Sequence, residues 1–212
     1  MSKTAPDPGK PARVWNELFN VPDYVFGTEP NTYLTEQKRY LKAGDKALLV
    51  ADGEGRNSVW CARQGLDVDA FDLSEKAVEK ARKLARDAQV SVNYSVAGID
   101  DWEWVPDRYD VVVVIFAQFA TPNMRTRLFA NCIRTLKPGG VLILQGYTPK
   151  QLEFKTGGPP LREHLYTEAL LRDSFRSLTL CELTCYDAFI REGARHTGMS
   201  ALIGMVVRKS TE

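Results

Sequence analysis

One short segment of the chain combines carboxylates with glycines; it reads Val50-Ala51-Asp52-Gly53-Glu54-Gly55-Arg56-Asn57. Gly53 and Gly55 permit a tight turn and let the main chain approach a ligand without a Cβ in the way. Asp72 follows 19 residues after Gly53 and ends the next β-rich run. There its carboxylate can accept hydrogen bonds from both hydroxyls of a ribose. The spacing therefore predicts a nucleoside-binding site.

The charge of this segment indicates which nucleoside is bound. A dinucleotide sets its pyrophosphate at a helix N-terminus and needs a third glycine for close approach. Here Asn57 or Ser58 fills that position, and Asp52 and Glu54 would repel two phosphates. S-adenosylmethionine has no phosphate, and its ammonium and sulfonium groups are attracted by carboxylates. We therefore expect S-adenosylmethionine, with S-adenosylhomocysteine as product, rather than a nicotinamide cofactor.

Strands and helices alternate around this segment. Strands are predicted over residues 46–51, 68–71, 92–95, 109–116 and 140–145, and helices over 57–64, 74–88 and 122–136. Such alternation implies a parallel sheet with helices on both faces. The β-rich runs 179–190 and 199–207 flank a polar turn, which predicts a hairpin. The expected fold is α/β, with a doubly wound, mostly parallel seven-stranded Rossmann-like sheet that ends in an antiparallel C-terminal hairpin.

Length and composition predict a single domain. The 212 residues are 44% hydrophobic, which suffices for one good-sized core. Residues 1–11, which include three prolines, are expected to be a disordered lead-in, and residues 12–212 to form one domain. Within that domain, residues 12–43 are expected to form a helical cover over the active site, where Asn31 can cap a helix to Leu41.

Charge and hydropathy exclude several functional classes. The 28 basic and 27 acidic side chains leave a net charge of +1, so no nucleic-acid or membrane partner is expected. The longest apolar run, 111–117, is far shorter than the roughly 20 residues that span a bilayer. No secretory signal is found either, so a cytoplasmic location is expected.

The four cysteines lack the spacing of a metal site. We therefore expect no bound metal and expect the thiols to be buried. A monomer or weak homodimer is expected.

Several motifs give the chain a resemblance to a known family. They are Asp-Gly-Glu-Gly-Arg-Asn-Ser-Val-Trp at 52–60, Leu-Lys-Pro-Gly-Gly at 136–140, Gln-Gly-Tyr-Thr-Pro-Lys-Gln-Leu at 145–152 and Phe-Gly-Thr-Glu-Pro-Asn at 26–31. Over roughly residues 14–208 the chain resembles the class I S-adenosylmethionine-dependent methyltransferases of the tellurite-resistance type. A small-molecule acceptor of soft or anionic character, such as a thiol, a chalcogen or a metalloid species, is the leading expectation. Transfer would be an in-line displacement, so positioning would dominate catalysis.

The resemblance also implies contacts after the third and fourth strands. In such enzymes an acidic side chain and a backbone N–H after the third strand hold adenine; the matching dipeptide is Gly98-Ile99, and Asp100 or Asp101 can substitute for the acidic residue. Phe116 would line the methionine end, and Gln118 stands where many relatives have histidine. The expected cofactor-binding residues are Asp52, Gly53, Gly55, Asn57, Asp72, Leu73, Gly98, Ile99 and Phe116.

Three residues are candidates for the acceptor side, and each has a plain structural alternative. Tyr147 could set its hydroxyl or ring beside a sulfonium, or it packs as a core aromatic. His196, with its neighbouring arginines, could hold an anionic acceptor, or it is an exposed turn residue. Tyr24, in the N-terminal cover, is the third candidate, and His164 is interpreted as structural.

Two alternative functions are carried beside the leading one. An RNA or protein methyltransferase is disfavoured by the near-neutral charge and the lack of an appended recognition domain. A catalytically weak module that binds S-adenosylmethionine or S-adenosylhomocysteine as a sensor is suggested by the missing acidic residue at Gly98 and by Gln118. The sequence specifies the donor far better than the acceptor.

Overall fold

A seven-stranded sheet organises the part of the chain that the computed structural model describes, residues 10–193 and 195–211. Its strands are β1 (Lys46–Val50), β2 (Asp67–Asp72), β3 (Asn93–Val96), β4 (Tyr109–Ile115), β5 (Leu136–Tyr147), β6 (Thr179–Glu192) and β7 (His196–Arg208). They lie in the order β3-β2-β1-β4-β5-β7-β6. Strands β1 to β5 are parallel, and β7 runs antiparallel to both β5 and β6. The predicted sheet with its C-terminal hairpin is confirmed.

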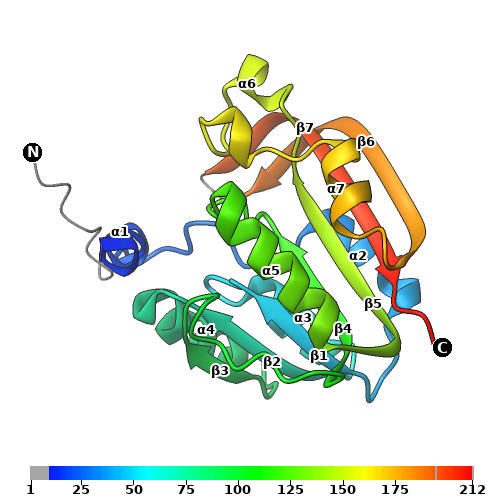
Figure 1. Cartoon of the computed structure of the whole chain (residues 1–212). Helices are drawn as coiled ribbons and strands as arrows, with labels where there is room; N and C mark the ends of the chain where they lie inside the picture. Colours follow the sequence, from blue (N-terminus) through cyan, green and yellow to red (C-terminus); the bar gives the residue numbers. More distant parts are fainter. Residues whose placement is uncertain (1–9, 194, 212) are drawn as a thin grey trace, which may run out of the picture.

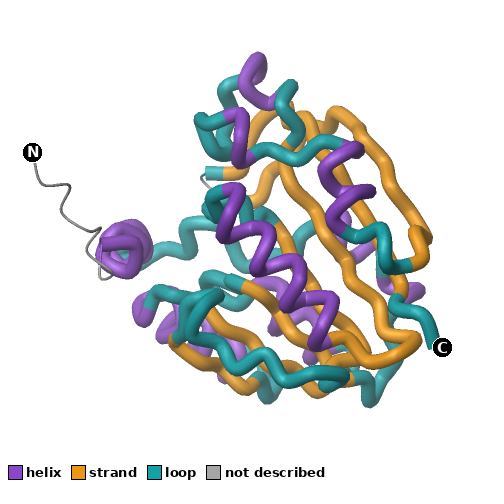
Figure 2. The backbone as a smooth tube through the Cα atoms, in the orientation of Figure 1, coloured by secondary structure: helices purple, strands orange, loops and turns teal. Residues whose placement is uncertain are grey.

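Helices cover both faces of this sheet, as Figures 1 and 2 show, with α5 and α7 in front and α2 and α3 behind. The helical elements are α1 (Lys10–Phe19), α2 (Thr32–Glu36), η1 (Lys38–Tyr40), α3 (Arg56–Arg63), α4 (Glu75–Asp87), α5 (Pro122–Thr135), α6 (Gln151–Phe154), η2 (Arg162–His164) and α7 (Glu168–Ser174). Over the described residues, no helix has both the length and the apolar character that a membrane crossing requires.

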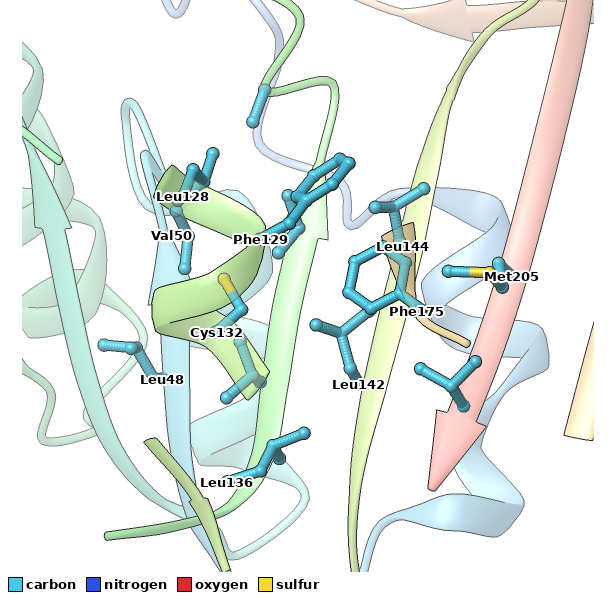
Figure 3. Close-up of a cluster of buried hydrophobic side chains, with 14 of the residues drawn as sticks. Leu48, Val50, Leu128, Phe129, Cys132, Leu136, Leu142, Leu144, Phe175 and Met205 are labelled. Atoms are coloured by element: carbon cyan, nitrogen blue, oxygen red, sulfur yellow. The ribbon is translucent and has the colours of Figure 1, made fainter. Parts of the chain in front are cut away.

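The central strands are buried on both sides, so successive side chains enter different cores. Leu48 and Val50 of β1 pack with the α5 side chains, among them Phe129, and Figure 3 shows this cluster. Leu49, between them, packs on the opposite face with Leu34 of α2. Burial on both faces explains why the parallel strands are continuous apolar runs rather than alternating ones.

Several element boundaries differ from the sequence prediction. Strand β5, for example, spans Leu136–Tyr147 rather than residues 140–145. Helix α1 begins at Lys10, inside the expected lead-in, because Pro11 is tolerated in a first helical turn; residues 1–9 of that lead-in lie outside the described residues. The segment 151–164, which lies outside the predicted helices, contains α6 and η2. Both are too short to produce a helical hydrophobic period in the sequence.

The hairpin and the cysteines bring further corrections. Strands β6 and β7 extend farther into the predicted polar turn, so that Glu192 and His196 are ladder partners.

Cys61 and Cys132 are buried as expected, whereas Cys181 and Cys185 are exposed. The expectation of buried thiols is wrong for this second pair because β6 is an edge strand with one face largely open to solvent.

A buried polar network joins the N-terminal segment to the hairpin. Arg56, at the start of α3, forms a 2.6 Å ion pair with Glu192 at the end of β6, and the side chains are only 7% and 6% exposed. The side-chain amide of Asn31 donates to both Glu192 oxygens, at 3.0 and 3.1 Å, and to Gln145 Oε1 at 2.7 Å. Asn31 also caps α2, as predicted, by accepting from Leu34 N–H, but α2 ends at Glu36 and not at the predicted Leu41. Segments far apart in sequence are thereby fixed to one another.

We expect replacement of Glu192 by leucine to lower the free energy of unfolding by about 3–5 kcal/mol, because Arg56 would be left buried without its counter-ion. The double variant Arg56→Met/Glu192→Leu should recover much of this loss. Urea unfolding at pH 7 measures both. Asp87→Ala, which opens the exposed Lys83–Asp87 pair, serves as control and should unfold close to wild type. Equal losses in the single and double variants would contradict the role of the ion pair.

Candidate functional site

A cavity of about 710 Å³ lies where the parallel strands end. Its walls include the residues that end or follow these strands: Ala51, Asp72, Leu73, Ala97, Ile115, Phe116 and Tyr147. The order of strands reverses at β1, which lies between β2 and β4. Open α/β sheets bind ligands in the crevice at such a point, so this cavity is the candidate site.

The turn between β1 and α3 uses its two glycines differently. Gly53 lines the cavity at φ +62°, and a Cβ there would meet only Phe19, at 3.9 Å. Gly55, at φ +91°, does not line the cavity; a Cβ on it would lie 2.7 Å from the Cβ of Ala81. Gly53 thus lets a ligand approach the backbone, whereas Gly55 is required for packing of the turn on α4.

Asp72 is held rigidly at the end of β2. Its Oδ2 accepts from Gly53 N–H at 2.9 Å, and its Oδ1 accepts from Ser74 N–H at 2.8 Å. Burial raises the pKa of Asp72, and the two backbone hydrogen bonds oppose that rise. Each carboxylate oxygen keeps a further lone pair, so the group can accept two hydroxyls of a ribose from the cavity.

Asp52 contributes a second, incompletely satisfied carboxylate. Its Oδ2 accepts from the Ser58 hydroxyl, while its buried Oδ1 has no partner among the described residues. Burial raises its pKa to about 7, and the nearby charge of Asp72 adds to the rise. Glu54 differs, because its charge is neutralised by Lys80, whose Nζ lies 2.8 Å from Glu54 Oε1. Of the two carboxylates predicted to select the ligand, Asp52 therefore keeps that capacity.

The remaining predicted cofactor residues meet at the same cavity: Asn57, Leu73, Gly98, Ile99 and Phe116 all line it. Asn57 acts indirectly, since its Oδ1 accepts the Asn31 N–H at 2.9 Å. Asp100 forms a two-point ion pair with Arg127, at 3.0 and 2.8 Å, which lowers the pKa of Asp100. Asp101, the other acidic residue of this segment, also lines the cavity.

Two of the three predicted acceptor-side residues share one aromatic wall. The ring of Phe116 lies 4.7 Å from that of Tyr147 and 4.5 Å from that of His196. The Nδ1 of His196 is buried without a hydrogen-bond partner among the described residues. Burial, with the positive charge of Arg56, lowers the pKa of His196 to about 4, so its ring is neutral at physiological pH.

Tyr24 lies elsewhere. It does not line the cavity, and its hydroxyl donates to the backbone oxygen of Lys80 at 3.2 Å. Its position over α4 gives no geometric support for a role beside the acceptor. The Tyr147 hydroxyl, by contrast, is buried, and burial raises its pKa.

Gln118 and His164 form a clamp that sequence reasoning did not identify. The Gln118 side chain donates to the backbone oxygens of Tyr147, at 2.9 Å, and His164, at 3.1 Å, and accepts from Tyr147 N–H at 2.6 Å. Its own backbone oxygen accepts from the His164 ring Nδ1 at 2.9 Å. The two residues are 46 positions apart, so no local pattern signals this pairing.

Helix α1 supplies an apolar roof. Trp15, Leu18 and Phe19 line the cavity, and the ring of Trp15 lies 6.3 Å from that of Phe119 across it. Their spacing of three and four residues is typical of one helix face and could have identified them in advance. The prediction of a helical cover over residues 12–43 included this helix but assigned none of these side chains to the site.

Comparisons with known proteins agree with this geometry. Residues 47–140 match a family model described as a methyltransferase domain. The ribosomal protein L11 methyltransferase of Dictyoglomus turgidum is 31% identical over 154 residues, which are 66% of this chain and 49% of that protein. A ubiquinone biosynthesis O-methyltransferase of Coxiella burnetii is 29% identical over 132 residues, 62% of this chain and 51% of the relative. The chain thus spans about half the length of these curated relatives.

A solved structure extends the comparison to the fold. The N-methyltransferase NodS of Bradyrhizobium japonicum WM9, in complex with S-adenosyl-L-homocysteine, superposes with a TM-score of 0.71 at 14% identity. The match covers 93% of this chain and 97% of NodS. These matches do not separate the tellurite-resistance type from other methyltransferases, so that finer assignment stays a prediction. Residues 47–140 are thus similar to a methyltransferase domain, and the described chain shares the fold of NodS.

Proposed function

We propose that this protein transfers a methyl group from S-adenosylmethionine to a small, soft acceptor enclosed in the cavity. The observation that carries the proposal is the pair of carboxylates at the ends of β1 and β2. Asp72 is positioned for a ribose, and the partnerless Oδ1 of Asp52 suits a cationic group of the donor. The donor supplies an activated methyl group on its sulfonium.

The chain's own residues would bind and orient the reactants. Gly98 and Ile99 would border the adenine, and Phe116 would lie beside the methionine end. Tyr147 and the neutral His196 would form the wall near the methyl group. The roof of α1 and the segment 157–161 would exclude water, which helps to align the nucleophile for an in-line displacement.

A recessed and partly covered site favours a small molecule over a macromolecule. Tyr147 and its neighbours lie beneath covering segments, so an acceptor must enter the cavity. A protein acceptor is the alternative, because the similar protein of Dictyoglomus turgidum is named a ribosomal protein L11 methyltransferase. A screen by mass spectrometry with isotope-labelled donor, run against thiols, chalcogen and metalloid species and bacterial ribosomal proteins, separates these possibilities. Labelling of ribosomal protein alone would replace the small-molecule proposal.

Donor binding provides the first quantitative test. We expect Asp72→Ala to weaken S-adenosylmethionine binding by roughly 10- to 150-fold, which corresponds to about 1.5–3 kcal/mol for charged hydrogen bonds. Titration calorimetry measures the change. Asp67→Asn is a matched control, because Asp67 lies on the same strand at its opposite end and should bind the donor as wild type does. Unchanged affinity in Asp72→Ala would reject the assigned ribose contact.

Asp52 should couple donor binding to stability. Its folded pKa of about 7 exceeds the unfolded value of about 4, so the folded state holds the extra proton and loses stability as pH rises from about 4 to 7. Asp52→Asn should therefore unfold at higher urea than wild type at pH 8, while binding the donor more weakly. Urea titrations at pH 4 and pH 8 test this. A variant that is no more stable than wild type at pH 8 would show that Asp52 is not strained by burial.

A further inference from the structure

We propose that the methyl acceptor is an uncharged, apolar thiol and that the Nε2 of His164 takes its proton during transfer. This inference rests on the proposed function and names its substrate class and its base. It gives His164, which the sequence suggested was structural, a chemical role.

The hydrogen bond of His164 to Gln118 fixes which ring nitrogen is basic. A backbone carbonyl oxygen can only accept, so Nδ1 must carry the proton that it donates to Gln118 O. In the neutral ring, Nε2 is then the nitrogen with the lone pair. Glu163 Oε1 lies 3.9 Å from it, beyond hydrogen-bond distance. Because His164 lines the cavity, that lone pair belongs to a residue of the cavity wall.

The segment that carries His164 is anchored on both sides. Gln118 Nε2 donates to the His164 backbone oxygen at 3.1 Å, and Arg125 of α5 donates to Glu163 O at 2.7 Å. The N–H of Tyr166 donates to Tyr147 O at 2.9 Å. A ring held at its own backbone and at Nδ1 is preorganised, as a general base must be.

His196, the other cavity histidine, is the weaker candidate for this role. Its pKa is lowered to about 4, so it accepts a proton poorly at neutral pH. Its ring is enclosed between Phe26 and Phe116, at 4.6 and 4.5 Å. It fits a neutral wall better than a base.

The charges around the acceptor side disfavour a strongly hydrated oxyanion. Arg56 is buried but already neutralised by Glu192, and Arg195 is exposed at the rim. The polar groups of Gln118 are all engaged. An oxyanion would thus find no unpaired buried cation among the described cavity residues, and its desolvation would be costly.

The rest of the acceptor side is apolar and suits sulfur. Phe119, Met124, Pro160 and Leu161 line it together with Trp15 from α1. A thiol forms weak hydrogen bonds, so it loses little on entering such a wall, whereas a hydroxyl or an ammonium group would lose much more. Nε2 of His164 can then accept the S–H, and the buried Tyr147 hydroxyl, which has no partner among the described residues, lies in the same cavity wall.

The reaction balances with these groups alone. The thiol sulfur forms a bond to the methyl carbon, and its proton moves to Nε2 of His164. The bond from that carbon to the donor sulfur breaks, and its electron pair stays on the departing thioether. The imidazolium then releases the proton to water, so no oxidant, metal or other reactant is needed.

Two thiols that differ in acidity test the inference in the intact protein with S-adenosylmethionine. A benzyl-type thiol is protonated at neutral pH, whereas an aryl thiol at pH 8 is already a thiolate. His164→Asn keeps a donor for Gln118 O but removes the base. It should lower kcat for the benzyl-type thiol by about 100-fold or more and leave the aryl thiol close to wild type. Equal loss on both thiols, or loss on neither, would overturn the role of His164.

A measurement on the protein without donor provides an independent readout. The chain has two histidines, so ¹⁵N spectra of the rings can be assigned with one variant. The neutral His164 ring should carry its proton on Nδ1; a proton on Nε2 would refute the proposal. Calorimetry with S-adenosylhomocysteine shows whether His164→Asn keeps a folded donor site. If the wild-type protein methylates oxyanions but neither thiol, the thiol inference is wrong and the proposed methyl transfer stands. If the wild-type protein neither binds the donor nor methylates any acceptor, the inference and the proposed function are both wrong.

Discussion

The buried ion pair between Arg56 and Glu192 is the interaction on which the site's shape most depends. Arg56 begins the helix that follows the ligand turn, and Glu192 ends the strand that leads to His196. Asn31 adds the N-terminal segment to the same carboxylate. The donor turn, the cover and the acceptor wall are therefore parts of one network. A buried pair of this kind contributes little net stability and is better understood as fixing a unique arrangement, since either charge alone would be costly.

The fold was largely readable from the sequence because its signals are local. Buried parallel strands appear as continuous apolar runs, Ser74 caps α4 where a serine precedes a periodic helix, and Gly53 and Asp72 mark the ends of consecutive strands. Each of these signals needs only neighbouring residues. The same locality marked the short turns after β1, β2 and β3, whose residues line the cavity.

The acceptor side was less predictable because distant segments build it. His164 gains its fixed tautomer from Gln118, and Trp15 reaches Phe119 across the cavity. Tyr24 shows the opposite error: its place near the cover suggested a role, but its hydroxyl is used by the backbone of α4. Local sequence cannot tell which of several polar residues in a covering segment faces inward, since that depends on packing between elements.

The cavity concentrates features that are unfavourable in the protein alone. Ala51 and Phe116 adopt positive φ, at +51° and +54°, although each carries a Cβ. Asp52 is buried with a raised pKa, and its Oδ1 lacks a partner. Such strain and unsatisfied charge persist only where the surrounding structure imposes them, and they occur together at the ends of β1 and β4. A cationic ligand beside Asp52 would offset this charge. The rigid network around Arg56 and the strained turns therefore serve one purpose: they hold an unfavourable surface open to a ligand that completes it.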